Sequence, residues 1–239
     1  LHAGRASYVG LFAARAAKRG FRGRDDIVEC EQGFAETMSS DFHPEAGLAD
    51  PQDGYHILSN VFKHHAACGA THSAIEATRM LMETQGMRPE DVRKITLKVD
   101  PKCDRICNIP DPNSGLEAKF SLRQTVALAL SGHNTSDPSV YSDALARDAG
   151  LRKLRERIQV EFLPVPAEES LLKLYTEVTA ELNDGRSLKE VFDVSLPSLS
   201  EEKRQQRLEE KFHVLARDEI GAAAAQRVVQ LSGSLDSLP

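Results

Sequence analysis

The densest set of reactive side chains lies between Lys63 and His72, where the chain reads Lys-His-His-Ala-Ala-Cys-Gly-Ala-Thr-His. Ser73 and Glu76 follow directly, and their spacing matches a capping box at the start of a helix. A helix N-terminus carries free N–H groups and a positive dipole, which Lys63 would reinforce. We therefore predict an anion-binding catalytic loop that runs into a helix.

Two other interpretations of this loop remain open. His64, Cys68 and His72 could hold zinc, but they share one face only if residues 64–72 are helical. Gly69 and the capping box place the helix start near His72, which breaks that face. Alternatively, these side chains simply line a surface loop.

A second cation stands at the start of another apolar helix, in the segment Glu117-Ala-Lys119-Phe-Ser121. Two cations beside two helix N-termini would suit a substrate with several carboxylates. His2 precedes an alanine-rich helix and is either a surface residue or a group facing a ligand.

The hydrophobic pattern predicts the elements that must position these residues. Ser200 is expected to cap a charged helix whose run at 201–211 forms a solvated face, and Asn183-Asp-Gly185 supplies a hairpin turn. Helices are predicted over 3–19, 73–86, 121–131, 201–216 and 218–231, and strands over 94–99, 158–162, 176–182 and 187–194. The plan is helical at both ends, with a mixed block at about 55–197 between them.

Composition narrows the class of protein. The 239 residues carry a net charge of −6, with 41% hydrophobic and 28% charged residues, as in globular proteins. Mild acidity argues against a nucleic-acid partner, and no apolar run is long enough to span a membrane. Four scattered cysteines are expected to be reduced thiols, which predicts a cytoplasmic location.

Several segments, in this order and spacing, resemble the MmgE/PrpD family. They are His2–Ala6, Leu11–Ala14, Gly20–Phe21, Glu31–Phe34, Lys63–Ala77 and Glu117–Leu122. The resemblance implies an α+β fold class: a partial all-helical domain formed by both chain ends, with an inserted α+β lid domain. The expected bounds are 1–45 for the first helical segment, 46–198 for the lid, and 199–239 for C-terminal helices that return to the helical domain.

The resemblance also implies residue roles. Lys63, His72 and His2 correspond to catalytic positions, and we expect Cys68, Lys119 and Ser121 to bind substrate, with no metal and no cofactor.

This sequence departs from the family pattern at two positions. Cys68 stands where cis-aconitate decarboxylase has a catalytic histidine, although many relatives have cysteine there, and Gln124 stands where many members have tyrosine.

Family members include 2-methylcitrate dehydratase, cis-aconitate decarboxylase and iminodisuccinate epimerase. The resemblance therefore predicts part of a lyase for small di- or tricarboxylates, with 2-methylcitrate dehydratase-like chemistry. Family chains are much longer, so we expect the site to need an N-terminal half, supplied within a homodimer or by a separate polypeptide. Decarboxylase or epimerase activity, and a non-catalytic complementing subunit or remnant, are the alternatives.

Overall fold

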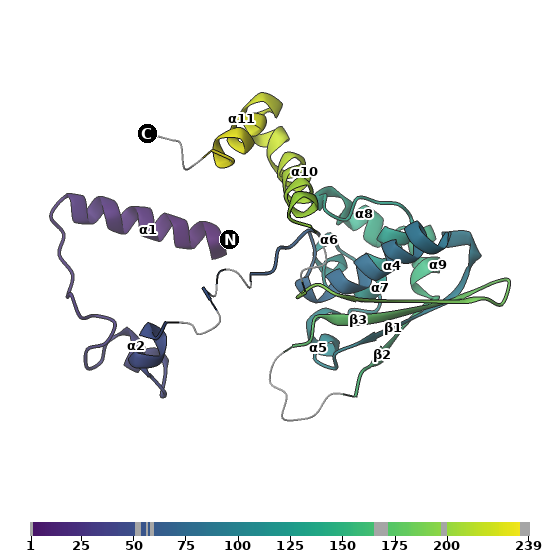
Figure 1. Ribbon diagram of the computed structural model, residues 1–239, viewed down its shortest axis with the longest axis horizontal. Coiled ribbons are helices and arrows are strands. Elements are labelled where there is room, and N and C mark those ends of the chain that lie inside the picture. The colour runs from purple at the N-terminus through teal and green to yellow at the C-terminus, as the bar shows by residue number, and fades with distance from the viewer. Residues whose placement is uncertain are drawn as a thin grey trace. The chain divides into compact units, whose positions relative to one another are not determined.

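A computed structural model describes residues 2–50, 54–55, 57, 60–164, 172–196 and 200–234, with backbone alone at the first two (Figure 1). The chain divides into two compact units, Leu1–Asn60 and Val61–Pro239. Each unit is described by itself below.

The first unit contains the helices α1 (His2–Lys18), α2 (Phe34–Met38) and α3 (Pro44–Leu48). Helix α1 confirms the prediction for residues 3–19, and Gly20 with φ +88° follows its end. Large apolar side chains of α1 face solvent: Tyr8 is 70% and Phe12 63% exposed.

The second unit is built around one four-stranded sheet in the order β2-β1-β3-β4. The strands are β1 (Val92–Val99), β2 (Ile158–Phe162), β3 (Tyr175–Leu182) and β4 (Ser187–Asp193). Strand β1 pairs parallel with β2 and antiparallel with β3. The predicted hairpin is confirmed: β3 and β4 are antiparallel, and Gly185 in the turn has φ +87°. A residue without a Cβ suits this left-handed backbone.

Helices α4 and α7 lie over one face of this sheet (Figure 1). The helical segments of this unit are η2 (Gly69–Thr71), α4 (His72–Gln85), η3 (Pro89–Asp91), α5 (Cys103–Cys107), α6 (Gly115–Ala118), α7 (Leu122–Leu130), η4 (Pro138–Val140), α8 (Asp143–Ala146), α9 (Ala149–Arg155), α10 (Glu201–Ile220) and α11 (Ala222–Ser232).

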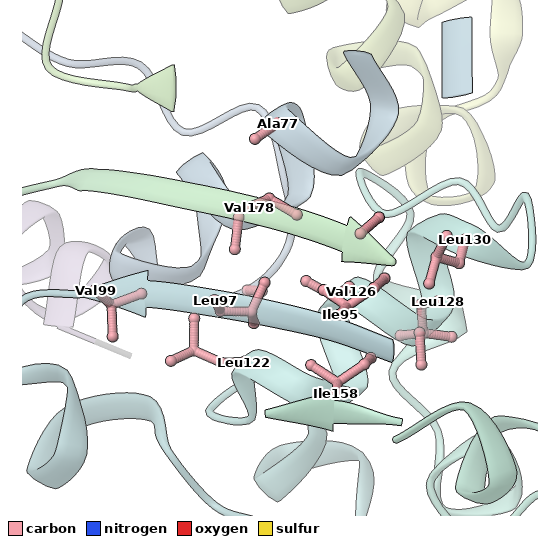
Figure 2. Close-up of a cluster of buried hydrophobic side chains, with 14 of the residues drawn as sticks. Ala77, Ile95, Leu97, Val99, Leu122, Val126, Leu128, Leu130, Ile158 and Val178 are labelled. Carbon is pink, nitrogen blue, oxygen red and sulfur yellow. The ribbon is translucent and has the colours of Figure 1, made fainter. Parts of the chain in front are cut away.

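The hydrophobic core lies between the sheet and the helices that cover it, chiefly α4 and α7. On β1, Ile95, Leu97 and Val99 are almost completely buried while Lys98 is exposed, because successive side chains of a strand point to opposite faces. Figure 2 shows Leu97 in one cluster with Leu122 of α7, Ile158 of β2 and Val178 of β3. The sheet is therefore covered on the face that carries α4 and α7.

The start of α4 differs from the prediction. The helix begins at His72 and ends at Gly86 as expected, but Thr71 is the N-cap and its side chain makes no capping bond. The Ser73 hydroxyl instead donates to the Leu174 carbonyl and accepts the Val194 N–H at 3.0 Å. The capping-box prediction was wrong because the Ser73 hydroxyl bonds instead to the residue before β3 and to the residue after β4.

The mixed α/β character predicted from the sequence is confirmed. The inserted lid, the domain bounds and the return of the C-terminal helices stay predictions. In the part of the chain that is described, no helix combines the length and apolar character needed to cross a bilayer.

Leu97→Ala tests the core assignment. Leu97 has no exposed surface, so the substitution should lower the free energy of unfolding by about 2–5 kcal/mol through lost burial and a residual cavity. Urea denaturation measures this change. Lys98→Ala, on the exposed face of the same strand, is the control and should stay within about 0.5 kcal/mol of wild type. Equal effects of the two substitutions would contradict the assignment.

Candidate active site

The segment that leads into α4 is held by loops on either side of α7. The Ala66 N–H donates to the Thr135 carbonyl, and the Cys68 N–H donates to the Lys119 carbonyl, both at 2.9 Å. The Thr71 hydroxyl then donates to the Cys68 carbonyl at 2.8 Å as the chain turns into the helix. These main-chain bonds fix the positions of the side chains in between.

His65 is buried in this segment, with its ring held on both sides. Its Nε2 lies 2.7 Å from Glu76 Oε1, and its Nδ1 lies 2.8 Å from the Thr135 hydroxyl. Burial lowers the pKa of His65 in spite of the neighbouring Glu76 carboxylate. We assign the neutral ring, with Nε2–H donating to Glu76 and Nδ1 accepting from Thr135.

The Glu76 carboxylate has a second partner on helix α10. Arg207 Nη2 lies 2.5 Å from Glu76 Oε1, and the two side chains are 24% and 12% exposed. Burial alone would raise the pKa of the Glu76 carboxyl, but hydrogen bonds from His65 and Arg207 hold it well below its usual range. Glu76 therefore stays ionised and ties α4, α10 and the His65 segment together.

His72 lies edge-on to His65, with ring centroids 4.9 Å apart and planes at 78°. Its ring is hydrogen-bonded to the backbone of Ala67, while Nε2 is buried and has no partner. Burial, aided by the neighbouring His65, lowers the pKa of His72 to about 3, so the ring is neutral at pH 7. A buried polar atom without a partner costs about 1–3 kcal/mol, and such atoms are often retained for function.

Two lysine side chains place positive charge beside these groups. Lys63 is exposed, and its charge contributes to lowering the pKa of both His72 and Cys68. Lys211 on α10 donates to the Lys63 carbonyl, and burial together with the Lys63 charge lowers the pKa of Lys211. The structure therefore brings Lys63, Cys68 and His72 into one electrostatic neighbourhood, with Lys211 added.

His64 follows Lys63 in the chain and is partly buried. Its Nδ1 is buried without a partner, and burial, aided by Arg207, lowers its pKa to about 4.

The two residues predicted on the second segment have different surroundings. Lys119 is joined to Cys68 through its carbonyl, and its Nζ lies 5.8 Å from the centre of the Tyr141 ring. Ser121 is the N-cap of α7: its hydroxyl donates to the Ile109 carbonyl at 2.6 Å and accepts the Gln124 N–H at 3.2 Å. Ser121 thus has a clear structural role in placing the helix.

Gln124 belongs to a different group of hydrogen-bonded side chains, and His2 belongs to the other unit. The Gln124 side chain is buried and bonds to the Leu145 carbonyl at 3.1 Å and to Arg155. His2 is the first residue of α1 in the other unit, and its side chain lies outside the described residues.

The zinc interpretation finds no geometric support. Within the described ranges, no group of three or more His, Cys, Asp and Glu side chains is arranged to hold a metal ion. A 3₁₀ turn at Gly69–Thr71 precedes α4, so His64, Cys68 and His72 do not share one helical face.

The sequence prediction missed the residues that hold the cluster in place. Glu76 was interpreted as part of a capping box, and Arg207 and Lys211 as part of a solvated helix face. The latter prediction was wrong at these two residues, because both side chains turn toward the His65 segment. The apolar residues along α10 indicate that one face of this helix packs against another part of the chain, but they do not indicate which part.

Comparison with known proteins supports the resemblance noted above. Residues 65–236 match the family described as the MmgE/PrpD C-terminal domain. Cis-aconitate decarboxylase from Homo sapiens is 25% identical over 251 residues, an alignment that covers 100% of this chain and 50% of that protein. The chain therefore spans half the length of this curated relative.

The buried neutral state of His72 predicts acid sensitivity. Its folded pKa of about 3 lies below the ordinary 6.5, so the unfolded chain binds more protons between these values. The contribution of His72 to the free energy of unfolding is therefore fully present above pH 6.5. It is lost as pH falls toward 3, and the free energy of unfolding then decreases by up to about 1.4 kcal/mol per pH unit. Urea denaturation between pH 7.5 and 5, at intervals of roughly half a pH unit, measures this change in the free energy of unfolding. His72→Gln should flatten the slope, whereas His43→Gln, at a ring 64% exposed, should not. Identical slopes in all three proteins would contradict this.

Arg207→Ala tests the tie between α10 and the site. It leaves the Glu76 carboxylate without its cation, so unfolding free energy should fall by about 1–3 kcal/mol, less than for a fully buried pair. The pKa of His65 should rise, because Arg207 no longer opposes its protonation. Denaturation and an NMR titration of the imidazole check the two effects. Arg207→Lys should retain part of both, and Gln206→Ala, at an exposed neighbour, should change neither. An unaltered His65 titration in Arg207→Ala would refute the tie.

Proposed function

Since the chain belongs to the MmgE/PrpD family, we propose that it forms part of a lyase acting on small di- or tricarboxylates. The proposed reaction removes a proton next to a carboxylate and expels a β-hydroxyl as water, as in 2-methylcitrate dehydratase. The observation that carries this proposal is the buried, neutral His72, whose Nε2 has no partner and whose ring is within the electrostatic influence of Lys63.

In this proposal Lys63 binds the carboxylate next to the carbon that loses its proton. As the C–H bond breaks, negative charge accumulates on that carboxylate. A fixed ammonium stabilises this charge more strongly in the transition state than in the bound substrate, which lowers the barrier. Lys211, whose Nζ donates to the Lys63 carbonyl, adds positive charge and holds the Lys63 backbone.

His72 is proposed to accept the proton at Nε2. Its hydrogen bond to the Ala67 backbone leaves Nε2 as the nitrogen with a free lone pair. A pKa near 3 suits the empty site poorly, since a general base works best near the ambient pH. A bound polycarboxylate would bring negative charge to the ring and raise its pKa, so the base would become stronger when substrate is present.

The remaining residues complete the proposal. The departing hydroxyl must take up a proton to leave as water. The family resemblance assigns a further catalytic role to His2, which is therefore the candidate donor. Lys119 is proposed to bind a second substrate carboxylate, and Cys68, joined to Lys119 by a main-chain bond, is proposed to line the same part of the substrate site. Ser121 is proposed to act by placing the N-terminus of α7 beside that carboxylate.

Decarboxylation is the second candidate, and the similarity to cis-aconitate decarboxylase favours it. Loss of CO₂ from a related polycarboxylate would leave negative charge at the same place, so Lys63 could serve either reaction. Cys68 in place of that enzyme's histidine weighs toward dehydration. A homodimer, or a complex with a polypeptide that supplies the N-terminal half, is proposed as the assembly.

Lys63→Ala and His72→Ala test the site in the assembled enzyme. Each should lower kcat for a 2-hydroxy polycarboxylate by at least about 10²-fold, since one removes the charge stabilisation and the other the base. Product analysis by mass spectrometry separates water loss from CO₂ release and so decides between the two candidates. Lys203→Ala, an exposed lysine on α10, is the control and should keep wild-type turnover. Wild-type turnover in both site variants would sink the assignment.

A further inference from the structure

Three of the four cysteines form one thiol cluster beside the candidate active site. Cys103 and Cys107 belong to the buried core cluster and Cys68 packs against it, and Cys107 acts on the pKa of both other thiols, so it is their shared neighbour. The cluster joins two elements, because Cys103 and Cys107 lie on α5 and Cys68 immediately precedes η2, against which α5 packs. Each of these cysteines is a free thiol in the structure.

Exposure differs sharply within the cluster. Cys107 has no exposed surface and Cys103 is 2% exposed, whereas Cys68 is only partly buried. A small oxidant from solvent can therefore reach Cys68 first, with Cys107 already in contact behind it.

The surroundings of Cys68 also favour its reactive form. Hydrogen bonding from the Cys107 thiol lowers the pKa of Cys68 to about 6, and the backbone of Ala70 and the Lys63 charge contribute in the same direction. The neighbouring thiols of Cys103 and Cys68, together with burial, raise the pKa of Cys107. Cys107 also lowers the pKa of Cys103, but Cys103 is buried, so Cys68 is the thiolate that peroxide can reach.

We propose that Cys68 and Cys107 form a reversible peroxide-sensitive pair, in which Cys68 is oxidised and Cys107 resolves it to a disulfide. The Cys68 thiolate attacks one peroxide oxygen, the O–O bond breaks, and hydroxide leaves to become water. The resulting sulfenic acid is attacked by the Cys107 sulfur, which loses its proton, and the hydroxyl leaves as a second water. Two thiols are oxidised and one hydrogen peroxide is reduced to two waters.

Formation of this disulfide would remove the thiol of Cys68 and pull its segment toward α5. Bonded sulfurs lie about 2.05 Å apart, so hydrogen-bonded thiols must approach each other further. The chain joining Cys68 to Lys63 and His72 would move with it. The disulfide itself does not depend on the enzyme's reaction, but the expected loss of activity rests on the proposed function.

Trypsin separates the three thiols, which makes the pairing directly readable. Cys68 lies in the peptide His64–Arg79, Cys107 in Ile106–Lys119 and Cys103 in Cys103–Arg105. After treatment with a small excess of hydrogen peroxide and alkylation of the remaining thiols, mass spectrometry should find His64–Arg79 linked to Ile106–Lys119. Dithiothreitol should release the pair. A linked pair containing Cys103–Arg105 instead, or Cys68 driven to sulfinic acid without a link, would overturn the proposal.

Variants and a wild-type rate provide independent checks. Cys107→Ala should abolish the link, while Cys103→Ala, the matched change at the other buried thiol, should retain it. If Cys107→Ala does not fold, the wild-type protein still decides: iodoacetamide should modify Cys68 at least about ten-fold faster than Cys30 at neutral pH. Equal rates would refute the proposal.

Activity is read separately. Peroxide should lower turnover about ten-fold or more and dithiothreitol should restore it. A disulfide that forms while no lyase activity exists in either state would count against the proposed function alone.

Discussion

A carboxylate shielded from water must be surrounded by donors, and the arrangement around Glu76 depends on this requirement. His65 and Arg207 supply those donors from two separate parts of the chain, the segment before α4 and the C-terminal helix α10. Because His65 is bonded to Glu76 and Thr135, its ring cannot turn, and it stays nearly perpendicular to the ring of His72. The ring that packs against the proposed base is thus held by the Glu76–Arg207 ion pair and by Thr135.

Much of this second unit could be predicted from the sequence. The alternation in Lys94–Val99 and the Asn183-Asp-Gly185 turn identify strands and a hairpin through local geometry alone. The hydrogen-bond partners of Ser73 and Glu76 could not be predicted, since the same two side chains can form either a local capping box or bonds to distant residues. Here the distant partners at Leu174, Val194 and Arg207 prevail.

For the candidate site, the sequence indicates which residues could take part but not how their side chains are arranged. The run from Lys63 to His72 could be selected as a candidate site from its residue types alone. The neutral state of His72 and the inward turn of Lys211 follow from burial, which a sequence pattern does not encode. Contacts between Cys68 and α5 likewise require the fold, because the intervening chain includes α4 and β1.

The order of the sheet also has a consequence for how the chain reaches this structure. Strands β3 and β4 are joined by a short turn, but Ile95 of β1 pairs with Ile158 of β2 across a stretch that contains α7 and several short helices. Closing such a long loop has a high entropic cost before any contact compensates it, so high contact order makes folding slow. The β3–β4 hairpin can form early, whereas β1 must close a long loop to pair with either β2 or β3 and joins later. Until then, the unpaired edge of β1 is the surface on which misfolding and aggregation would begin.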